Sequence, residues 1–216
     1  IKMALNKKNL SNLFYGFITI HLITWTLIPT LTNNNLPLDT IEALAWGSNL
    51  DWGFNKHPPL SAFFSEIFFR IFGPQDWAYY LLSQIFVIIS FYFVFKLSND
   101  LLNNLKLSFI AVLLLEGIYF YNFTTPEFNV NISQLPFWTL TVYFTWKIFK
   151  KKQPHVFDLI LLGIFAAAGI LSKYLFLYLL ISIDLLFLYL ILVAKDRKFQ
   201  ITYLISLEVF LLLLIP

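Results

Sequence analysis

The chain has 216 residues, of which 59% are hydrophobic and only 12% are charged, with a net charge of +3. Soluble domains carry about 25% charged residues, so this composition indicates a protein embedded in a lipid bilayer. The absence of cysteine excludes disulfides and thiolate metal sites, and nothing in the distribution of charge suggests nucleic-acid binding.

Seven apolar stretches predict membrane spans. A helix needs about 20 apolar residues to cross the hydrocarbon core, and helices are expected because backbone groups in lipid must be hydrogen-bonded internally. In chain order, the predicted spans are residues 13–31, 77–97, 107–121, 135–149, 157–171, 175–194 and 201–216. The third to fifth are short, and we expect them to extend into flanking polar residues. The predicted fold class is all-α: a polytopic transmembrane helical protein with about seven spans.

The two ends of the sequence bear on its completeness. Met3 is the expected start of the protein, and the apolar run 205–215 is cut off at Pro216. We therefore expect residues 1–216 to be the N-terminal part of a larger membrane-embedded domain whose C-terminal part is missing.

The distribution of lysine and arginine predicts the orientation of the spans. With the N-terminus in the cytoplasm, 12 of the 15 Lys and Arg residues fall inside, and only Lys56, Arg70 and Lys173 fall outside. The positive-inside rule favours this orientation. No small-residue cleavage site follows the first apolar stretch, so a span is expected there rather than a signal peptide.

Four polar clusters fall on the outer side in this orientation. They are residues 39–42 (Asp-Thr-Ile-Glu), 55–59 (Asn-Lys-His-Pro-Pro), 127–131 (Glu-Phe-Asn-Val-Asn) and 172–174 (Ser-Lys-Tyr). Polar residues at the mouths of spans often line a site. Because all four gather on one side, we expect a site that faces the periplasm, the cell exterior or an organelle lumen.

The first outer loop, residues 32–76, contains a predicted amphipathic helix at residues 60–72. Its apolar stripe consists of Leu60, Phe63, Phe64, Ile67, Phe68 and Ile71, and its other face is marked by Ser61, Ser65, Glu66 and Arg70. Glu66 and Arg70 are four residues apart and predict a helical ion pair, and Gly73-Pro74 predicts the end of the helix. Such a helix is expected to lie in the membrane interface, as a shelf for a lipid-linked substrate.

The spacing of Asp39 and Glu42 supports two interpretations. As a capping box, Asp39 caps a helix that runs to about Trp46, and Glu42 reaches back to the cap. As a catalytic group, a carboxylate just above the membrane accepts a proton from an attacking hydroxyl or holds a metal. The two interpretations are compatible, since residues three apart share a helix face.

The candidate cations have similar alternatives. Lys56 and His57 precede a proline pair that starts the amphipathic helix, so they are either solvated loop residues or, with the positive end of that helix, a phosphate site. Lys173 either snorkels at the interface or supplies a second phosphate contact. Glu127 is either a solvated loop carboxylate or, with Asn129 close by, part of the lining of a site.

Polar groups also lie inside the predicted spans. Asp184 and Glu116 are functional candidates, because intramembrane acids are costly, whereas His21 is expected to be a packed polar residue. No metal-ligand spacing, Walker loop or dinucleotide fingerprint is present, so a metal site stays unknown and a nucleotide-dependent mechanism has no support.

The polar clusters carry a family resemblance. The run Leu-Asp-Thr-Ile-Glu-Ala-Leu-Ala-Trp-Gly at residues 38–47, followed by Lys-His-Pro-Pro-Leu at 56–60, resembles bacterial family 39 glycosyltransferases. These are the protein mannosyltransferase and aminoarabinose transferase group of the GT-C superfamily. Later segments that look like landmarks of the same proteins are residues 125–129, 136–138 and 171–174. The resemblance covers most of residues 13–175.

The resemblance implies a GT-C-like integral membrane glycosyltransferase with a polyprenyl-phosphate-linked sugar donor. The acceptor is lipid A or lipopolysaccharide, another glycan or a protein on the outer side of a bacterial inner membrane, and membrane lipids surround the enzyme. By similarity, Asp39 activates the acceptor or orients the sugar, with Glu42 as its catalytic partner. Lys56 and His57 occupy the region that contacts the lipid phosphate. The remaining predicted binding residues are Glu127, Asn129, Lys173 and Tyr174.

This chain departs from the family patterns in two places. The aminoarabinose-transferring relatives tend to carry Glu-Lys-Pro where this chain has Lys56-His57-Pro58, which puts a metal site of their kind in doubt. No cofactor is therefore certain, although a divalent metal is possible. The adjacent Asp-Glu pair of protein mannosyltransferases is replaced by two acids three residues apart.

The alternative function is a polytopic transporter or flippase of a lipid-linked or small substrate. It explains the spans and the intramembrane Asp184, but it predicts inverted repeats and helices broken near the midplane. The sequence has no such repeat, and its polar clusters lie at the predicted outer face. A third class, a non-catalytic assembly subunit, has no specific support.

Overall fold

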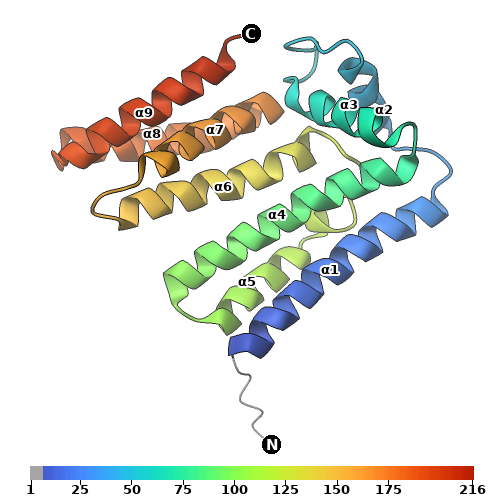
Figure 1. Ribbon diagram of the computed structural model, residues 1–216, viewed down its shortest axis with the longest axis horizontal. Helices are drawn as coiled ribbons and strands as arrows, with labels where there is room; N and C mark the ends of the chain where they lie inside the picture. Colours follow the sequence, from blue (N-terminus) through green and yellow to red (C-terminus); the bar gives the residue numbers. More distant parts are fainter. Residues whose placement is uncertain (1–6) are drawn as a thin grey trace, which may run out of the picture.

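The computed structural model describes residues 7–216, and helices are the only regular secondary structure among these residues (Figure 1). The all-α prediction is confirmed. Met3 and Lys2, the expected start and the first expected inner cation, lie outside the described residues. The helices are α1 (Lys7–Thr32), α2 (Leu38–Gly47), α3 (Leu60–Phe72), α4 (Asp76–Leu102), α5 (Leu105–Glu116), η1 (Tyr119–Tyr121), α6 (Val130–Lys150), α7 (Val156–Ser172), η2 (Tyr174–Phe176), α8 (Leu177–Leu192) and α9 (Arg197–Leu214).

Three helical segments of the described chain are long and apolar enough to cross a membrane. They are Lys8–Thr32, Asp76–Leu102 and Tyr174–Leu192, and α7 is a shorter apolar helix. The chain is therefore an integral membrane protein with several apolar helices, while the count of seven spans stays a prediction. α6 extends into flanking polar residues as expected, but α5 has 12 residues and ends at Glu116. At 1.5 Å per residue α5 is about 18 Å long, shorter than the hydrocarbon core of about 30 Å.

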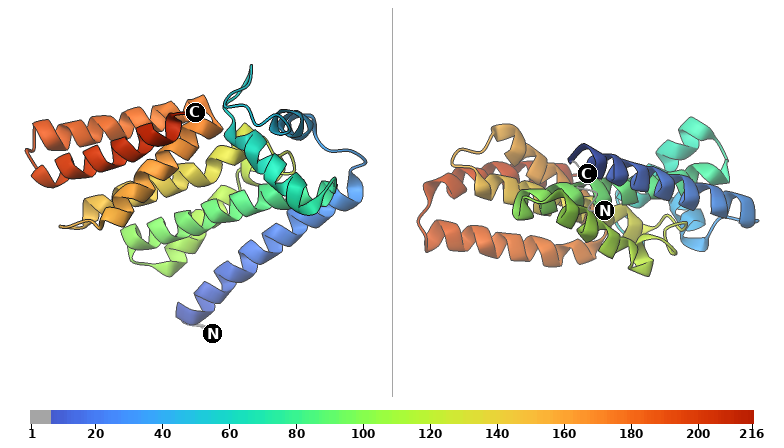
Figure 2. Two further views of the ribbon diagram at one scale, coloured as in Figure 1. Left: turned by 45° about the horizontal axis from the view of Figure 1, so that its top comes forward. Right: turned by 90° about the horizontal axis from the view of Figure 1, so that it is seen from below.

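The helices pack as an array in which α4 lies between α1 and α6, and α7 lies between α6 and α9 (Figures 1 and 2). α1 is antiparallel to α4 and α6 is antiparallel to α7, whereas α4 and α6 run in the same direction, as do α7 and α9. Aromatic side chains fill the space between them. Phe14 of α1 stacks on Phe95 of α4 with ring centroids 4.0 Å apart, and Phe128 is fully buried against Phe86. Lipid tails are as apolar as these side chains, so close packing and polar contacts rather than water exclusion hold such helices together.

A buried polar cluster joins α1, α4 and α5 within the array; we call it the His21 junction. His21 Nε2 lies 3.1 Å from Gln84 Oε1, and Gln84 Nε2 donates to Thr125 Oγ1 at 2.9 Å. His21 Nδ1 lies 2.9 Å from Glu116 Oε2, the separation of an ion pair, although the contact is not aligned as a hydrogen bond. His21 is thus a packed polar residue, as the sequence predicts, and Glu116 is its partner.

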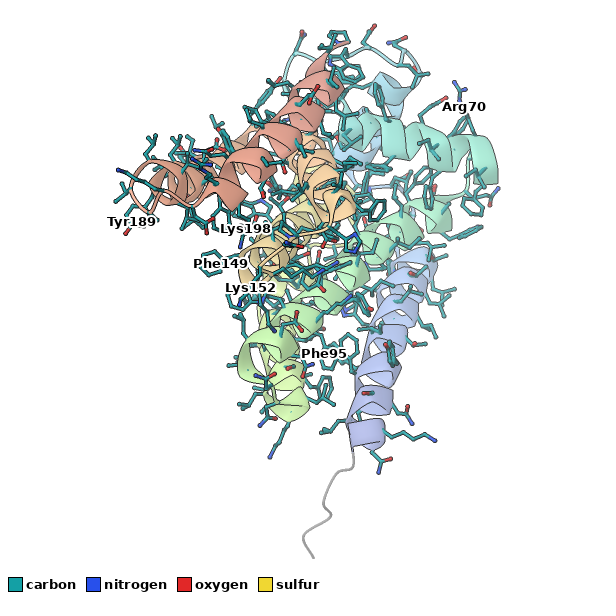
Figure 3. The ribbon with its side chains drawn as sticks, turned by 60° about the vertical axis from the view of Figure 1, so that its left-hand side comes forward. Arg70, Phe95, Phe149, Lys152, Tyr189 and Lys198 are labelled. Atoms are coloured by element: carbon teal, nitrogen blue, oxygen red, sulfur yellow. The ribbon has the colours of Figure 1, made fainter. Side chains whose placement is uncertain are left out.

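The polar and basic loops lie at opposite ends of the array. The site end carries α2, α3, the segment 122–129 and Lys173, whereas the basic end carries the 151–155 and 193–196 loops. Figure 3 shows Lys152 and Lys198 at the basic end, away from Arg70 on α3. Buried Asp158 pairs there with Lys147 at 2.7 Å and with Lys151 at 3.2 Å, which neutralises part of the basic cluster.

α7 and α9 approach each other closely at Gly163. A Cβ atom at Gly163 would lie 2.5 Å from the carbonyl oxygen of Ser206 and 2.8 Å from the Cβ of Val209. Ser206 Oγ also donates to the carbonyl oxygen of Leu159 at 3.0 Å. A small residue here allows two helix backbones to approach, as is common in membrane proteins.

We predict that Gly163→Ala lowers the stability of the protein by about 1–3 kcal/mol, because the added methyl group meets backbone of α9 that cannot give way. The matched control is Gly16→Ala in α1, where nothing lies within 4 Å of the new Cβ. Alanine has the higher helix propensity, by about 1 kcal/mol, so the control is expected to be neutral or stabilising. Melting temperatures of the detergent-solubilised proteins measure both, and equal effects of the two substitutions would contradict the prediction.

Candidate functional site

The first turn of α2 places Asp39 differently from the capping-box interpretation. Pro37 is the N-cap residue, with φ of −60° and no side-chain cap, and the helix begins at Leu38. The fixed φ of proline favours entry into a helix, so the helix starts early and Asp39 lies inside its first turn. The capping box is therefore wrong. Glu127, 88 residues away in the sequence, accepts the backbone N–H of Asp39 at 3.1 Å instead.

The segment 122–129 docks on α2 through two further hydrogen bonds. Thr40 Oγ1 donates to the carbonyl oxygen of Phe128 at 3.2 Å, and Asn129 Nδ2 donates to Asp39 Oδ2 at 3.1 Å. Thr40 and Phe128 are both fully buried, so the contact excludes water. Asp39 thus has fixed neighbours on both its main chain and its carboxylate.

Asn129 is held in place because it also caps α6. Its Oδ1 accepts the backbone N–H of Asn131 at 2.9 Å and of Ile132 at 3.2 Å. An asparagine at an N-cap uses its side-chain oxygen in this way. Since the oxygen faces the helix, the Nδ2 group is directed away from it, toward the Asp39 carboxylate.

Four of the predicted site residues meet in one small pocket. Asp39, Glu42, His57 and Asn129 line a cavity of about 10 Å³, which is the size of one water molecule. Lys56 lies at its edge, with its Nζ 2.5 Å from Glu42 Oε1. The Lys56 side chain is 60% exposed, and exposed ion pairs contribute about 0–1 kcal/mol, so this contact is easily exchanged for another anion.

Lys173 contacts the first turn of α6, the helix that Asn129 caps. Its Nζ donates to Asn131 Oδ1, and the hydroxyl of the preceding residue, Ser172, accepts a hydrogen bond from Ser133 Oγ at 3.1 Å. Burial lowers the pKa of the Lys173 amine below its usual value. Tyr174 is not brought into the cluster, because its side chain is exposed at the start of η2.

α3 has the predicted bounds, the predicted Glu66–Arg70 ion pair at 2.7 Å and the predicted end at Gly73, whose φ is +72°. The face described as polar is the packed one, since Ser61 and Ser65 are buried. Gly47 of α2 allows this contact: a Cβ atom there would lie 2.6 Å from the carbonyl oxygen of Ala62. Of the predicted apolar stripe, Ile67 and Ile71 are exposed, whereas Leu60, Phe64 and Phe68 pack against the core.

Several residues of the site were missed in the sequence. Trp46 and Ser61 line the pocket, and the Trp46 ring stacks on Phe54 with centroids 5.3 Å apart. Thr40 carries a docking hydrogen bond, and Gln84 holds Thr125 of the docked segment. Gln84 carried a usable signal, since a polar residue in the middle of a predicted span rarely lies there without a partner.

The other acids are placed elsewhere. Glu116 belongs to the His21 junction, and Asp184 lines a mostly apolar cavity of about 130 Å³ between α7, α8 and α9, together with Tyr203. Among residues 7–216, no three His, Asp or Glu side chains are grouped closely enough to hold a metal ion.

The fold and this site define a class of protein: an all-helical membrane protein with carboxylates and cations collected at one end of its helices. Residues 56–216 match the family described as dolichyl-phosphate-mannose-protein mannosyltransferase (PMT_2). The chain belongs to this family, and it is a membrane glycosyltransferase that uses a lipid-phosphate-linked sugar donor. No curated protein and no solved structure matches the chain.

The family match covers only part of the candidate site. It begins at Lys56 and so includes His57, Glu127, Asn129 and Lys173 but neither Asp39 nor Glu42. The two acids are brought to the matched segment by their contacts with Asn129 and Lys56.

We predict that Lys173 reacts with an amine-acylating reagent at lower pH than a free lysine amide in the same solution. Only the neutral amine reacts, and a lowered pKa means that this form is populated at lower pH. Mass spectrometry of the labelled protein over a pH series gives the half-reaction pH for Lys173 and for the added amide together. A half-reaction pH for Lys173 at or above that of the amide would contradict the prediction.

Proposed function

We propose that this protein transfers a sugar from a polyprenyl phosphate to a hydroxyl group of an acceptor on the outer side of the membrane. The acceptor classes are lipid A or lipopolysaccharide, another glycan and a protein. The observation that carries the proposal is the position of Asp39, which is held between Asn129 and Glu127 with the Lys56–His57 cations beside it.

The orientation follows from the same division of charge. We propose that α1, α4, α5 with η1, α6, α7, η2 with α8, and α9 span the membrane. The basic end then faces the cytoplasm, in agreement with the positive-inside rule, and the site end faces the periplasm or exterior. α3 lies in the interface with Ile67 and Ile71 toward lipid, since these side chains are 48% and 65% exposed.

The proposed reaction is a single displacement. Asp39 takes the proton of the acceptor hydroxyl, whose oxygen forms a new bond to the anomeric carbon of the donor sugar. The bond between that carbon and the phosphate oxygen breaks, and its electron pair leaves with the polyprenyl phosphate, so the anomeric configuration is inverted. Lys56 and Lys173, together with His57 when it is protonated, are the groups proposed to stabilise the charge that develops on the leaving phosphate.

The closed pocket implies that a loop moves when the donor binds. A cavity of about 10 Å³ cannot hold a sugar ring. Its movable wall is the irregular segment 48–59, which carries Lys56 and His57. The donor phosphate competes with Glu42 for Lys56, so the exposed ion pair is the contact that donor binding replaces. Glu42 is then free to bind sugar hydroxyls.

We predict that Asp39→Asn lowers sugar transfer by about 10²–10⁴-fold, the usual contribution of a general base. The measurement uses membranes that contain the whole encoded protein, a panel of radiolabelled polyprenyl-phosphate sugars, and counting of label in lipid, glycan and protein fractions. The matched control is Asp51→Asn, the same change at an exposed acid in the loop after α2. Undiminished transfer by Asp39→Asn at equal expression would remove Asp39 from the centre of the reaction.

A second prediction separates the two roles of Asn129. Asn129→Ala and Asn104→Ala both remove an N-cap with the same pair of backbone contacts, at α6 and α5, and both are expected to cost about 1 kcal/mol of stability. Only Asn129 also orients Asp39, so only its replacement is expected to lower transfer, by as much as about 100-fold. Similar activity of the two variants at equal expression would contradict the orienting role.

A further inference from the structure

A groove separate from the Asp39 pocket runs along the last turns of α1. Its volume is about 500 Å³, far larger than the pocket itself. One wall consists of Trp25, Ile28 and Thr32 of α1, and the other consists of residues 119–127, among them Phe123. Nothing in the reaction described above uses this space.

The groove reaches the first turn of α2, which carries Asp39. Glu127 lines it, and the same Glu127 side chain accepts the backbone N–H of Asp39. Pro37, the N-cap of α2, lines it as well. A molecule lying in the groove therefore has its head near the first turn of α2.

The lining is neutral or acidic and rich in hydrogen-bonding groups. No lysine, arginine or histidine lines the groove, and Glu127 is its one charged residue, accompanied by Thr32, Asn33 and Thr124. His57 lines the pocket and Lys56 pairs with Glu42 of the pocket, and neither of them lines the groove. A phosphate would be repelled by Glu127 and would find no cation in the groove, whereas hydroxyl groups can donate to the Glu127 carboxylate.

The aromatic side chains of the groove suit the apolar faces of sugar rings. Tyr119 and Phe123 are 63% and 70% exposed, and their rings are roughly parallel, with centroids 6.3 Å apart. Trp25 meets the Phe123 ring edge-on at 6.4 Å. Aromatic rings combine a large apolar surface with little conformational freedom, which makes them good platforms for a flat ligand.

The groove also descends into the membrane. Trp25 lies seven residues before Thr32, the last residue of α1, which is about 10 Å along the helix at 1.5 Å per residue. Ile28 is 50% exposed between them. A soluble glycan or peptide would leave this apolar depth empty, whereas a lipid-anchored molecule fills it with its hydrocarbon part.

We propose that this groove binds the acceptor, and that the acceptor is a neutral, lipid-anchored glycan with a free hydroxyl directed at Asp39. The inference rests on the proposed function and adds the substrate class. The chemistry agrees with it: a hydroxyl acceptor needs a base such as Asp39, whereas a phosphate acceptor is already an anion and needs none. Donor and acceptor then approach from opposite sides, with the cations on the donor side alone.

The test uses the double variant Tyr119→Ala/Phe123→Ala in proteoliposomes of the whole encoded protein, with the donor that the wild type accepts. The matched control is Tyr178→Ala/Phe157→Ala, which removes one tyrosine and one phenylalanine with 69% and 65% exposure from other helices. The acceptors are a diacylglycerol-linked hexose, a phosphorylated lipid A analogue and a serine-containing peptide. Transfer to each acceptor and donor hydrolysis by water are measured separately.

The expected result is a preference for the diacylglycerol-linked hexose, with a KM for it raised at least tenfold in the groove variant and unchanged in the control. The donor KM and the rate of donor hydrolysis stay unchanged, because the donor side is intact. A raised donor KM, preference for the phosphorylated or peptide acceptor, or an unchanged acceptor KM would each overturn the inference. Absence of both transfer and donor hydrolysis in the wild type would instead overturn the proposed function itself.

Discussion

The arrangement of the site depends on one amide group, the side chain of Asn129. Its oxygen is committed to the first turn of α6 and its nitrogen to the Asp39 carboxylate, so a single side chain couples a long helix to the acid at the start of α2. An amide satisfied at both ends has one orientation, and it passes the rigidity of α6 to the carboxylate. The neighbouring bonds from Thr40 and to Glu127 complete a contact that pins α2 at one end.

The docked segment is itself anchored from within the membrane. Thr125 accepts a hydrogen bond from Gln84, whose oxygen faces His21, so the His21 junction lies directly behind the segment that carries Glu127 and Asn129. Individual hydrogen bonds between membrane helices contribute only about 0.6 kcal/mol on average. These hydrogen bonds act here mainly by fixing the positions of the groups they join. An unpaired polar group in hydrocarbon is costly, so each group of the junction has few alternative positions. The short α5 fits this picture, because it ends where Glu116 reaches His21.

The sequence predicted the helices and the grouping of polar residues better than it predicted the contacts. Long apolar runs predict one end of α1 and one end of α4 to within a residue, but α1 starts six residues before its predicted span and α4 ends five residues after its own. The pattern of residues 60–72 predicts both ends of α3, because periodicity and a Gly-Pro stop are local signals. The role of Asp39 as a cap was wrong, since Pro37 starts α2 early. The true cap comes from Glu127, and a partner 88 residues away leaves no mark in the spacing of the residues it serves.

The position of α2 explains how one carboxylate can work between two unlike substrates. Asp39 stands in the first turn of a helix, with Asn129, Glu42 and His57 on its pocket side and Glu127 on the side of the groove. In the proposed arrangement, Lys56 on the pocket side attracts the donor phosphate, whereas the Glu127 carboxylate on the groove side has no cation beside it, so the donor and the acceptor are expected at different faces of the same turn. Such sorting also suppresses the reverse arrangement, because a phosphate placed in the groove would face an acid without any cation to offset it.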